Sequence, residues 1–202
     1  MECMERTRFE QLLAAYSADL RAIQQGAAQA HALVNQLYDG NKPYSFHLDM
    51  VADLVREYGH LILQSEDDLL PLFMGAWYHD TIEDARLSYN DVRSEAARLG
   101  FSPVQVTMAA EIVYALTNEK GRTRAERAGE RYYEGIRQTP YAPFCKMCDR
   151  LANYRYSLCG TNGHNQRMKR VYEEEMPHFL ASLHTDAEDP RLAVPEEMLL
   201  KL

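Results

Sequence analysis

The chain has 202 residues, of which 46% are hydrophobic and 26% are charged, and its formal net charge at pH 7 is -8. This length and apolar content suit one domain with a single core. The negative charge argues against binding nucleic acid or an anionic membrane over a broad surface, because both favour a basic partner. No apolar run is long enough for a membrane span, and MECMERTRFEQLL at the start lacks a signal-peptide pattern. We therefore expect a soluble, cytoplasmic protein.

Apolar residues recur at steps of three and four along most of the chain, which predicts helices. In chain order the predicted helices cover residues 8–37 with a bend at Gly26, 47–58, 67–83, a segment that starts at 102 with a capping box, 124–137, 141–158 and 165–184. Runs of alternating β-branched residues are missing from the sequence. We therefore predict an all-α fold over residues 1–185, followed by a tail at 186–202 in which Pro190 and Pro195 disfavour regular structure.

The stretch GAWYHDTIED, residues 75–84, begins as an apolar helix and ends in His79, Asp80, Glu83 and Asp84. Unpaired charges at the end of a buried helix cost several kcal/mol or change their protonation state. A divalent cation would compensate them, and imidazole with carboxylate suits manganese, iron, zinc or nickel better than calcium. In the alternative reading, His79 and Asp80 merely end the helix, and Glu83 and Asp84 are solvated.

Two further segments contribute residues of the same chemical type. His47 in KPYSFHLDMV and Asp149 in CKMCDRLANYR complete a set with the order H…HD…D on three predicted helices. This set, with HDTIED (79–84), PYSFH (43–47), KMCDRLAN (146–153) and AHALVNQ (30–36), resembles the HD-domain superfamily of metal-dependent phosphohydrolases. Within it, the motifs are similar to the hydrolase domain of RelA/SpoT-type alarmone enzymes and to small stand-alone alarmone hydrolases. The resemblance covers roughly residues 20–185.

The resemblance implies an HD-type helical bundle with a metal site on its central helices, and an enzyme that removes the 3'-pyrophosphate of (p)ppGpp. It implies that one divalent ion, usually Mn²⁺ with Fe, Zn, Ni and Mg as alternatives, is held by His47, His79, Asp80 and Asp149. Glu83 and Asp84 would serve the attacking water. The candidate substrate contacts are Lys146, Arg150, Asn153, Tyr44 and Lys42. For Asn153 a hydrogen bond between helices remains an alternative, and for Arg150 an internal ion pair.

The chain departs from the family pattern at Leu37 and Tyr38, where basic residues are usual, and at Leu48 and Ala85. Hydrolysis of another nucleotide, a mono- or triphosphate, therefore remains open, as does a non-catalytic nucleotide-binding regulatory module. A di-iron oxygenase would need further histidine ligands. We expect a small anionic nucleotide as the partner, with no nucleic acid and no membrane, and a homodimer remains open.

Residues 118–133, NEKGRTRAERAGERYY, form the one markedly basic stretch, with Lys120, Arg122, Arg124, Arg127 and Arg131. They either cover a polyanionic substrate as a lid hinged at Gly121 or form a solvated helix face paired with neighbouring glutamates.

Two other residue types need an interpretation. His31 resembles a family histidine for which packing or support of the site is at least as plausible as direct chemistry. The cysteines are Cys3, Cys145, Cys148 and Cys159, and we interpret the Cys145/Cys148 pair as structural thiols, since no second CxxC completes a zinc site.

Overall fold

Helices make up most of the computed structural model, which describes residues 4–118, 122–160, 163–185 and 188–200. In chain order the elements are α1 (Arg6–Ala15), α2 (Ser17–Leu33), β1 (Leu37–Tyr38), β2 (Lys42–Pro43), α3 (Ser45–Tyr58), η1 (Gly59–Leu61), η2 (Glu66–Asp68), α4 (Leu69–Tyr78), α5 (Tyr89–Arg98), α6 (Pro103–Leu116), α7 (Arg124–Arg127), α8 (Glu130–Gln138), α9 (Ala142–Cys159), α10 (Gly163–Leu183), η3 (Pro190–Leu192) and α11 (Glu196–Leu199). The strands pair antiparallel, with Leu37 opposite Pro43. The predicted all-α class is therefore confirmed.

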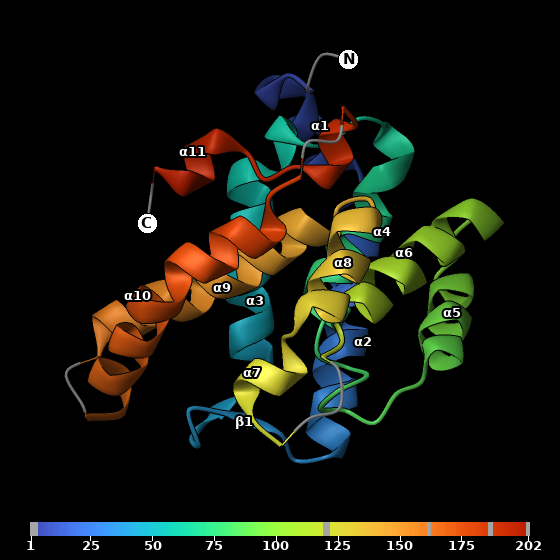
Figure 1. Cartoon of the computed structure of the whole chain (residues 1–202). Helices are drawn as coiled ribbons and strands as arrows, with labels where there is room; N and C mark the ends of the chain where they lie inside the picture. Colours follow the sequence, from blue (N-terminus) through green and yellow to red (C-terminus); the bar gives the residue numbers. More distant parts are fainter. Residues whose placement is uncertain (1–3, 119–121, 161–162, 186–187, 201–202) are drawn as a thin grey trace.

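Helix α4 lies at the centre of the bundle (Figure 1) and packs against α2, α3, α6 and α9. Every residue of α4 except Leu70 is buried, because its sequence LLPLFMGAWY is apolar on all sides. Helix α5 lies outside α6, and α10 lies along α9 with contacts to α8. The C-terminal end of α4 is therefore surrounded by other helices, and the residues that follow it are placed inside the molecule.

Several predicted boundaries were wrong. The long helix at 8–37 is two helices, which are separated at Tyr16, where ψ is 18°. The helix at 124–137 is interrupted before α8 by Gly129, which has extended backbone angles. Helix α5 was missed, although Ser88 and Asp91 form a capping box at its start. The capping box predicted at Ser102 is confirmed.

The C-terminal segment also differs from the expected irregular tail, since residues 188–200 contain η3 and α11. Met198 is fully buried in the core. The backbone N–H of Tyr141 donates to the carbonyl oxygen of Arg191 at 2.6 Å. The prolines limit these helices to a few residues, and burial of Met198 holds the segment against the bundle.

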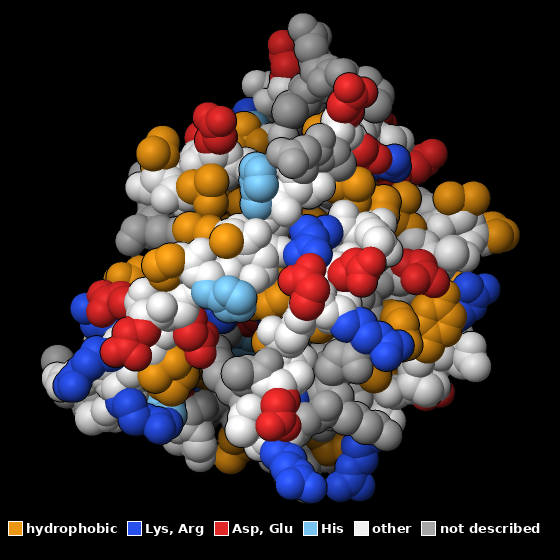
Figure 2. All heavy atoms as spheres, in the orientation of Figure 1, with side chains coloured by type: hydrophobic (Ala, Val, Ile, Leu, Met, Phe, Trp, Pro, Cys, Tyr) orange, Lys and Arg blue, Asp and Glu red, His pale blue; other side chains and the backbone are white. Residues whose placement is uncertain are grey.

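Charged side chains of both signs are interspersed on the face of the molecule in Figure 2, with hydrophobic side chains between them. None of the described helices is both long and apolar enough to cross a membrane.

Replacing Gly75 with alanine is expected to destabilise the protein by about 1–3 kcal/mol, the usual cost of overpacking a core. A Cβ at this position would lie 2.4 Å from Cγ2 of Ile112, where α4 meets α6. Gly135 in α8 is a matched control, because a Cβ there would meet nothing within 4 Å. Gly135→Ala should be neutral or stabilising, since alanine favours helix more than glycine does. Urea denaturation would measure both changes, and equal free energies of unfolding for the two variants would contradict the assigned close contact.

Candidate active site

Four side chains from three parts of the chain meet at the inner end of α4. His47 lies in the first turn of α3, His79 and Asp80 follow α4 directly, and Asp149 lies within α9. The Nε2 atoms of His47 and His79 are 3.2 Å apart. Asp80 Oδ2 is 3.0 Å from His79 Nε2, and Asp149 Oδ1 is 3.3 Å from His47 Nε2. The H…HD…D set of the sequence is therefore one cluster in space.

The segment HDTIED is not the helical extension that the sequence predicted, because α4 ends at Tyr78 and turns follow. The hydroxyl of Thr81 donates to the carbonyl oxygen of Tyr78 at 2.7 Å, so this side chain takes up an acceptor at the helix end. The backbone N–H of Asp84 then donates to Asp80 at 2.8 Å, and Arg86 has a positive φ of 62°. These turns direct Asp80, Glu83 and Asp84 towards one pocket.

A hydrogen bond orients His79 in the cluster, whereas His47, whose Nδ1 has no hydrogen-bond partner, is oriented by ring stacking. His79 Nδ1 donates to the carbonyl oxygen of Ala76 at 2.8 Å, which leaves its Nε2 as the nitrogen that faces the cluster. The ring of His47 stacks on Tyr38, with centroids 5.1 Å apart and 6° between the planes. Tyr44 donates its hydroxyl to Asp80 Oδ2 at 2.5 Å. An oriented imidazole whose outer nitrogen is hydrogen-bonded is the usual arrangement of a metal-ligating histidine.

The donor set fits a metal ion. His47, His79 and Asp80 each offer one ligand atom, and these atoms all lie within 4.8 Å of one another. Asp149 Oδ1 lies 3.8 Å from His79 Nε2 and 3.3 Å from His47 Nε2, so it is close to both imidazole nitrogens. Two imidazole nitrogens with two carboxylates suit a divalent transition metal. These residues could therefore hold one divalent ion.

The pKa values show how the buried charges compensate one another in the protein alone. Burial disfavours the imidazolium of His79, yet the neighbouring Asp80 and its hydrogen bond raise the pKa of His79 to about 9. Burial likewise opposes ionisation of Asp80 and Asp149, but His79 lowers the pKa of Asp80, and Lys146 lowers that of Asp149. Protonated His79 thus supplies positive charge that a bound cation would replace, with release of the proton.

Glu83 and Asp84 lie beside the cluster and line the same pocket. Glu83 accepts from Asn118 Nδ2 at 2.8 Å, and Asp84 accepts from Gln36 at 3.3 Å. Burial, followed by the charges of Asp80 and Glu83, raises the pKa of Asp84 to about 6. A carboxylate with a pKa near neutrality can accept a proton from water more readily than an ordinary aspartate.

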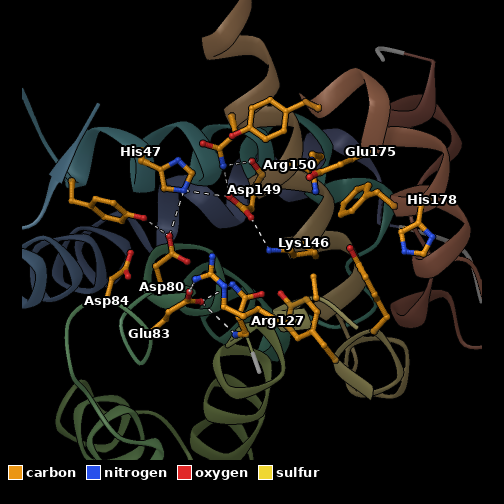
Figure 3. Close-up of a pocket in the computed structure, with 18 residues that line it drawn as sticks. His47, Asp80, Glu83, Asp84, Arg127, Lys146, Asp149, Arg150, Glu175 and His178 are labelled. Atoms are coloured by element: carbon orange, nitrogen blue, oxygen red, sulfur yellow. Dashed lines mark hydrogen bonds and ion pairs between the residues drawn. The ribbon is translucent and has the colours of Figure 1, made fainter. Parts of the chain in front are cut away.

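The pocket has a volume of about 380 Å³ and extends from the cluster to α7, α8 and α10 (Figure 3). This volume lies within the usual range for small-molecule sites. Its lining residues are Tyr44, His47, Asp80, Glu83, Asp84, Asn118, Arg127, Ala128, Tyr132, Tyr133, Lys146, Asp149, Arg150, Asn153, Tyr172, Glu175, His178 and Phe179. His79 lies behind this surface and is 3% exposed.

Four of the five predicted substrate contacts line the pocket, but each is already hydrogen-bonded. Lys146 donates to Asp149 Oδ2 at 2.9 Å, and Asn153 donates to Asp149 Oδ1 at 2.7 Å. Arg150 donates to Glu175 at 2.7 Å, and Tyr44 holds Asp80. Of the alternatives left open by the sequence, Arg150 has the internal ion pair. Asn153 accepts a hydrogen bond from Tyr38 at 3.0 Å, but Tyr38 lies in β1, so this bond does not join two helices.

Lys42 is the predicted contact that the structure does not bring to the pocket. Its Nζ donates to the hydroxyl of Tyr156 at 2.9 Å, beside the β1–β2 hairpin. Conversely, sequence reasoning missed Tyr172, Glu175, His178 and Phe179 of α10 as pocket residues. The helical pattern predicted α10, but its motifs carry no signal for a site, because the pocket depends on how α10 packs on α9.

The basic stretch of residues 118–133 lies partly in the pocket. Arg127 lines it, with Nη1 3.8 Å from Glu83 Oε1. Lys120 and Gly121, and thus the proposed hinge, lie outside the described residues, and so does the side chain of Arg124. Of the cysteines, Cys145 and Cys148 are buried, which raises the pKa of both thiols, and Cys159 is exposed. Cys3 lies outside the described residues.

His31 is buried and stacks on Tyr44, with centroids 4.4 Å apart, but neither of its ring nitrogens has a hydrogen-bond partner. Its role is therefore to pack behind a residue that contacts Asp80. Burial lowers the pKa of His31 to about 4, with Asp80 opposing the shift and His79 and His47 adding to it.

The low pKa of His31 predicts a pH-dependent loss of stability. In the unfolded chain His31 has its ordinary pKa of about 6.5, which is higher than its pKa in the folded protein. The contribution of neutral His31 to stability is therefore fully present above pH 6.5 and is lost as pH falls towards 4. The loss attributable to His31 reaches about 3 kcal/mol. His31→Phe keeps a ring against Tyr44 and removes the titration, so its free energy of unfolding should fall less between pH 7 and pH 4.5. The free energy of unfolding would be measured by urea denaturation of both chelator-treated proteins across this pH range. An equal fall for the wild type and for His31→Phe would refute the prediction.

No known protein-family model matches the chain, and no curated protein matches it either. Among solved structures, it is similar to that of a metazoan ortholog of SpoT, a protein that hydrolyses ppGpp and plays a role in starvation responses. The two are 22% identical, and the TM-score is 0.62 over 91% of this chain and 95% of that chain. The chain has the fold of that hydrolase. The helical-bundle fold expected from the resemblance is therefore confirmed, and the four-residue cluster lies at the end of its central helix.

Proposed function

We propose that this protein is a metal-dependent phosphohydrolase that acts on a nucleotide, with (p)ppGpp 3'-pyrophosphate hydrolysis as the most specific version. The observation that carries the proposal is the meeting of two histidines and two aspartates on one side of a pocket that Glu83 and Asp84 also line. The fold shared with a ppGpp hydrolase supports the same conclusion.

In this proposal His47, His79, Asp80 and Asp149 are the ligands of one divalent ion, and Mn²⁺ is the ion that the resemblance implies. A bound divalent ion acidifies water and stabilises negative charge on a phosphoryl oxygen. Tyr44 orients Asp80, and Asn153 and Lys146 orient Asp149, through the hydrogen bonds that they donate. Each ligand carboxylate would therefore be held in position before a metal arrives.

The chain's own acid and base groups would carry the proton transfers. Asp84, with its raised pKa, is placed to accept the proton of the attacking water, and Glu83 to hold that water beside it. Lys146 and Arg150 would offset negative charge on the substrate from the opposite wall, where they line the pocket. We further propose a small anionic nucleotide as the partner and the cytoplasm as the place of action.

A panel of nucleotides tests this proposal. The Mn²⁺-loaded protein would be incubated with ppGpp, nucleoside and deoxynucleoside triphosphates and nucleoside monophosphates, and released phosphate and pyrophosphate would be measured. We expect pyrophosphate release from ppGpp that stops when a chelator is added. Faster release from another nucleotide would assign the protein to that substrate. Binding without any release would instead support a regulatory nucleotide-binding module.

A further inference from the structure

Three cationic side chains among the described residues line the pocket, and two of them are held by short, part-buried ion pairs. Lys146 Nζ lies 2.9 Å from Asp149 Oδ2, with both side chains at most 16% exposed. The Arg150 side chain is 9% exposed, lies 2.7 Å from Glu175 and stacks over the ring of Phe179 at 4.5 Å. Moving Lys146 would take a cation away from the part-buried carboxylate of Asp149, and moving Arg150 would break a short ion pair and the ring contact of a side chain that is itself buried.

Arg127 differs from these two cations in the length of its ion pair and in the exposure of its side chain. Its Nη1 is 3.8 Å from Glu83 Oε1, close to the limit for an ion pair, and its side chain is 46% exposed. An exposed pair of this length contributes little to stability. Glu83 also accepts from Asn118 Nδ2 at 2.8 Å, so its carboxylate keeps a donor when Arg127 moves away. Figure 3 shows Arg127 and Glu83 next to each other, on the side of the pocket where Asp80 lies.

The pocket is rich in carboxylates, so binding of an anionic substrate requires a cation that can contact phosphate. Asp80, Glu83, Asp84, Asp149 and Glu175 line it, and a phosphate group that enters meets this negative field. Lys146 and Arg150 have little-exposed side chains in short ion pairs, whereas the pair of Arg127 is long and its side chain is exposed. Arg127 is therefore the described cation of the pocket that can change partners at least cost. The planar guanidinium also matches two phosphate oxygens at once.

We propose that Arg127 is a substrate-binding residue that exchanges Glu83 for a phosphate group of the nucleotide. This inference rests on the proposed function and adds a specificity: the residue recognises a phosphate in addition to the one attacked, so it favours substrates with a pyrophosphate group over monophosphates.

The test uses Arg127→Gln and Arg127→Lys, with Arg93→Gln as a control that removes the same charge from α5, at a position that does not line the pocket. Calorimetry would measure the affinity of each Mn²⁺-loaded protein for inorganic pyrophosphate, and steady-state kinetics would give KM and kcat on the best nucleotide of the panel. Thermal unfolding would confirm that each variant folds.

We expect Arg127→Gln to weaken pyrophosphate binding and raise KM by about tenfold or more, as for a charge-assisted hydrogen bond. Its kcat should change much less, because the contact forms in the ground state as well. Arg127→Lys should be intermediate, and Arg93→Gln should match the wild type. Unchanged pyrophosphate affinity and KM in Arg127→Gln would overturn the inference, even if kcat fell. If the wild type hydrolyses no nucleotide, the proposed function fails, while the pyrophosphate titration still decides the role of Arg127.

Discussion

Asp84→Asn is expected to keep the fold and the bound metal but to lower hydrolysis at saturating substrate by at least about 10²-fold, the lower range for loss of a general base. Asp84 lines the pocket, and burial with the nearby Asp80 and Glu83 charges raises its pKa to about 6. Asparagine has the same size and keeps a hydrogen bond to Gln36, but it cannot accept a proton from water. The loss should therefore appear in kcat, while metal content stays the same.

Glu83→Gln tests the second member of the pair and should give a loss of the same order. Asp19→Asn is the matched control, because Asp19 is exposed in α2 and does not line the pocket. Metal content by elemental analysis and melting temperature would be measured for all three variants. If Glu83→Gln and Asp84→Asn both retain nearly full turnover on the best substrate, the catalytic assignment is wrong, and the pair is only a solvated part of the turn.

Asp149→Asn should lose metal and activity together, which separates a ligand from a proton acceptor. Asp149 Oδ1 lies 3.3 Å from His47 Nε2, and its Oδ2 accepts from Lys146 at 2.9 Å. The neutral amide is a much weaker ligand than carboxylate, and it removes the carboxylate that pairs with the part-buried Lys146. Because metal bound to the folded state stabilises it, the variant should also melt at a lower temperature.

A chelator provides the control for Asp149→Asn. Chelator treatment should lower the melting temperature of the wild type and change that of the variant little, since the variant has no metal to lose. Elemental analysis would show about one ion per wild-type chain and far less in the variant. A variant that retains stoichiometric metal would remove Asp149 from the proposed ligand set.

Sequence reasoning was most successful where the pattern is local. The continuous apolar run at 69–78 predicted a central helix, and the Ser102 capping box predicted the start of α6. The same reasoning carried the helix on to Glu83, since it did not weigh the bond from Thr81 to the Tyr78 carbonyl oxygen. It also merged α1 with α2, because one apolar stripe runs through both helices across the break at Tyr16.

The candidate site shows the same division. The order of His47, His79, Asp80 and Asp149 in the chain and the resemblance of their motifs to a known family selected them as a set, and the structure brings them together. Lys42 was selected for its place near the PYSFH motif, but the hairpin turns its amine towards Tyr156. Position beside a motif predicted the neighbourhood of that side chain but not its direction.

The sequence by itself determined the helical class, the central helix and the residue types of the candidate metal site, because helical periodicity is a property of neighbouring residues and the order of the motifs can be read along the chain. Only the tertiary structure decided which cations form short ion pairs with buried side chains and which form long, exposed ones. Arg127 and Arg150 are the same residue type. Arg127 lies 3.8 Å from Glu83, whereas Arg150 lies 2.7 Å from Glu175 and contacts the ring of Phe179. That difference arises from the packing of α7, α9 and α10, and the strength of an ion pair depends on separation and burial rather than on residue type.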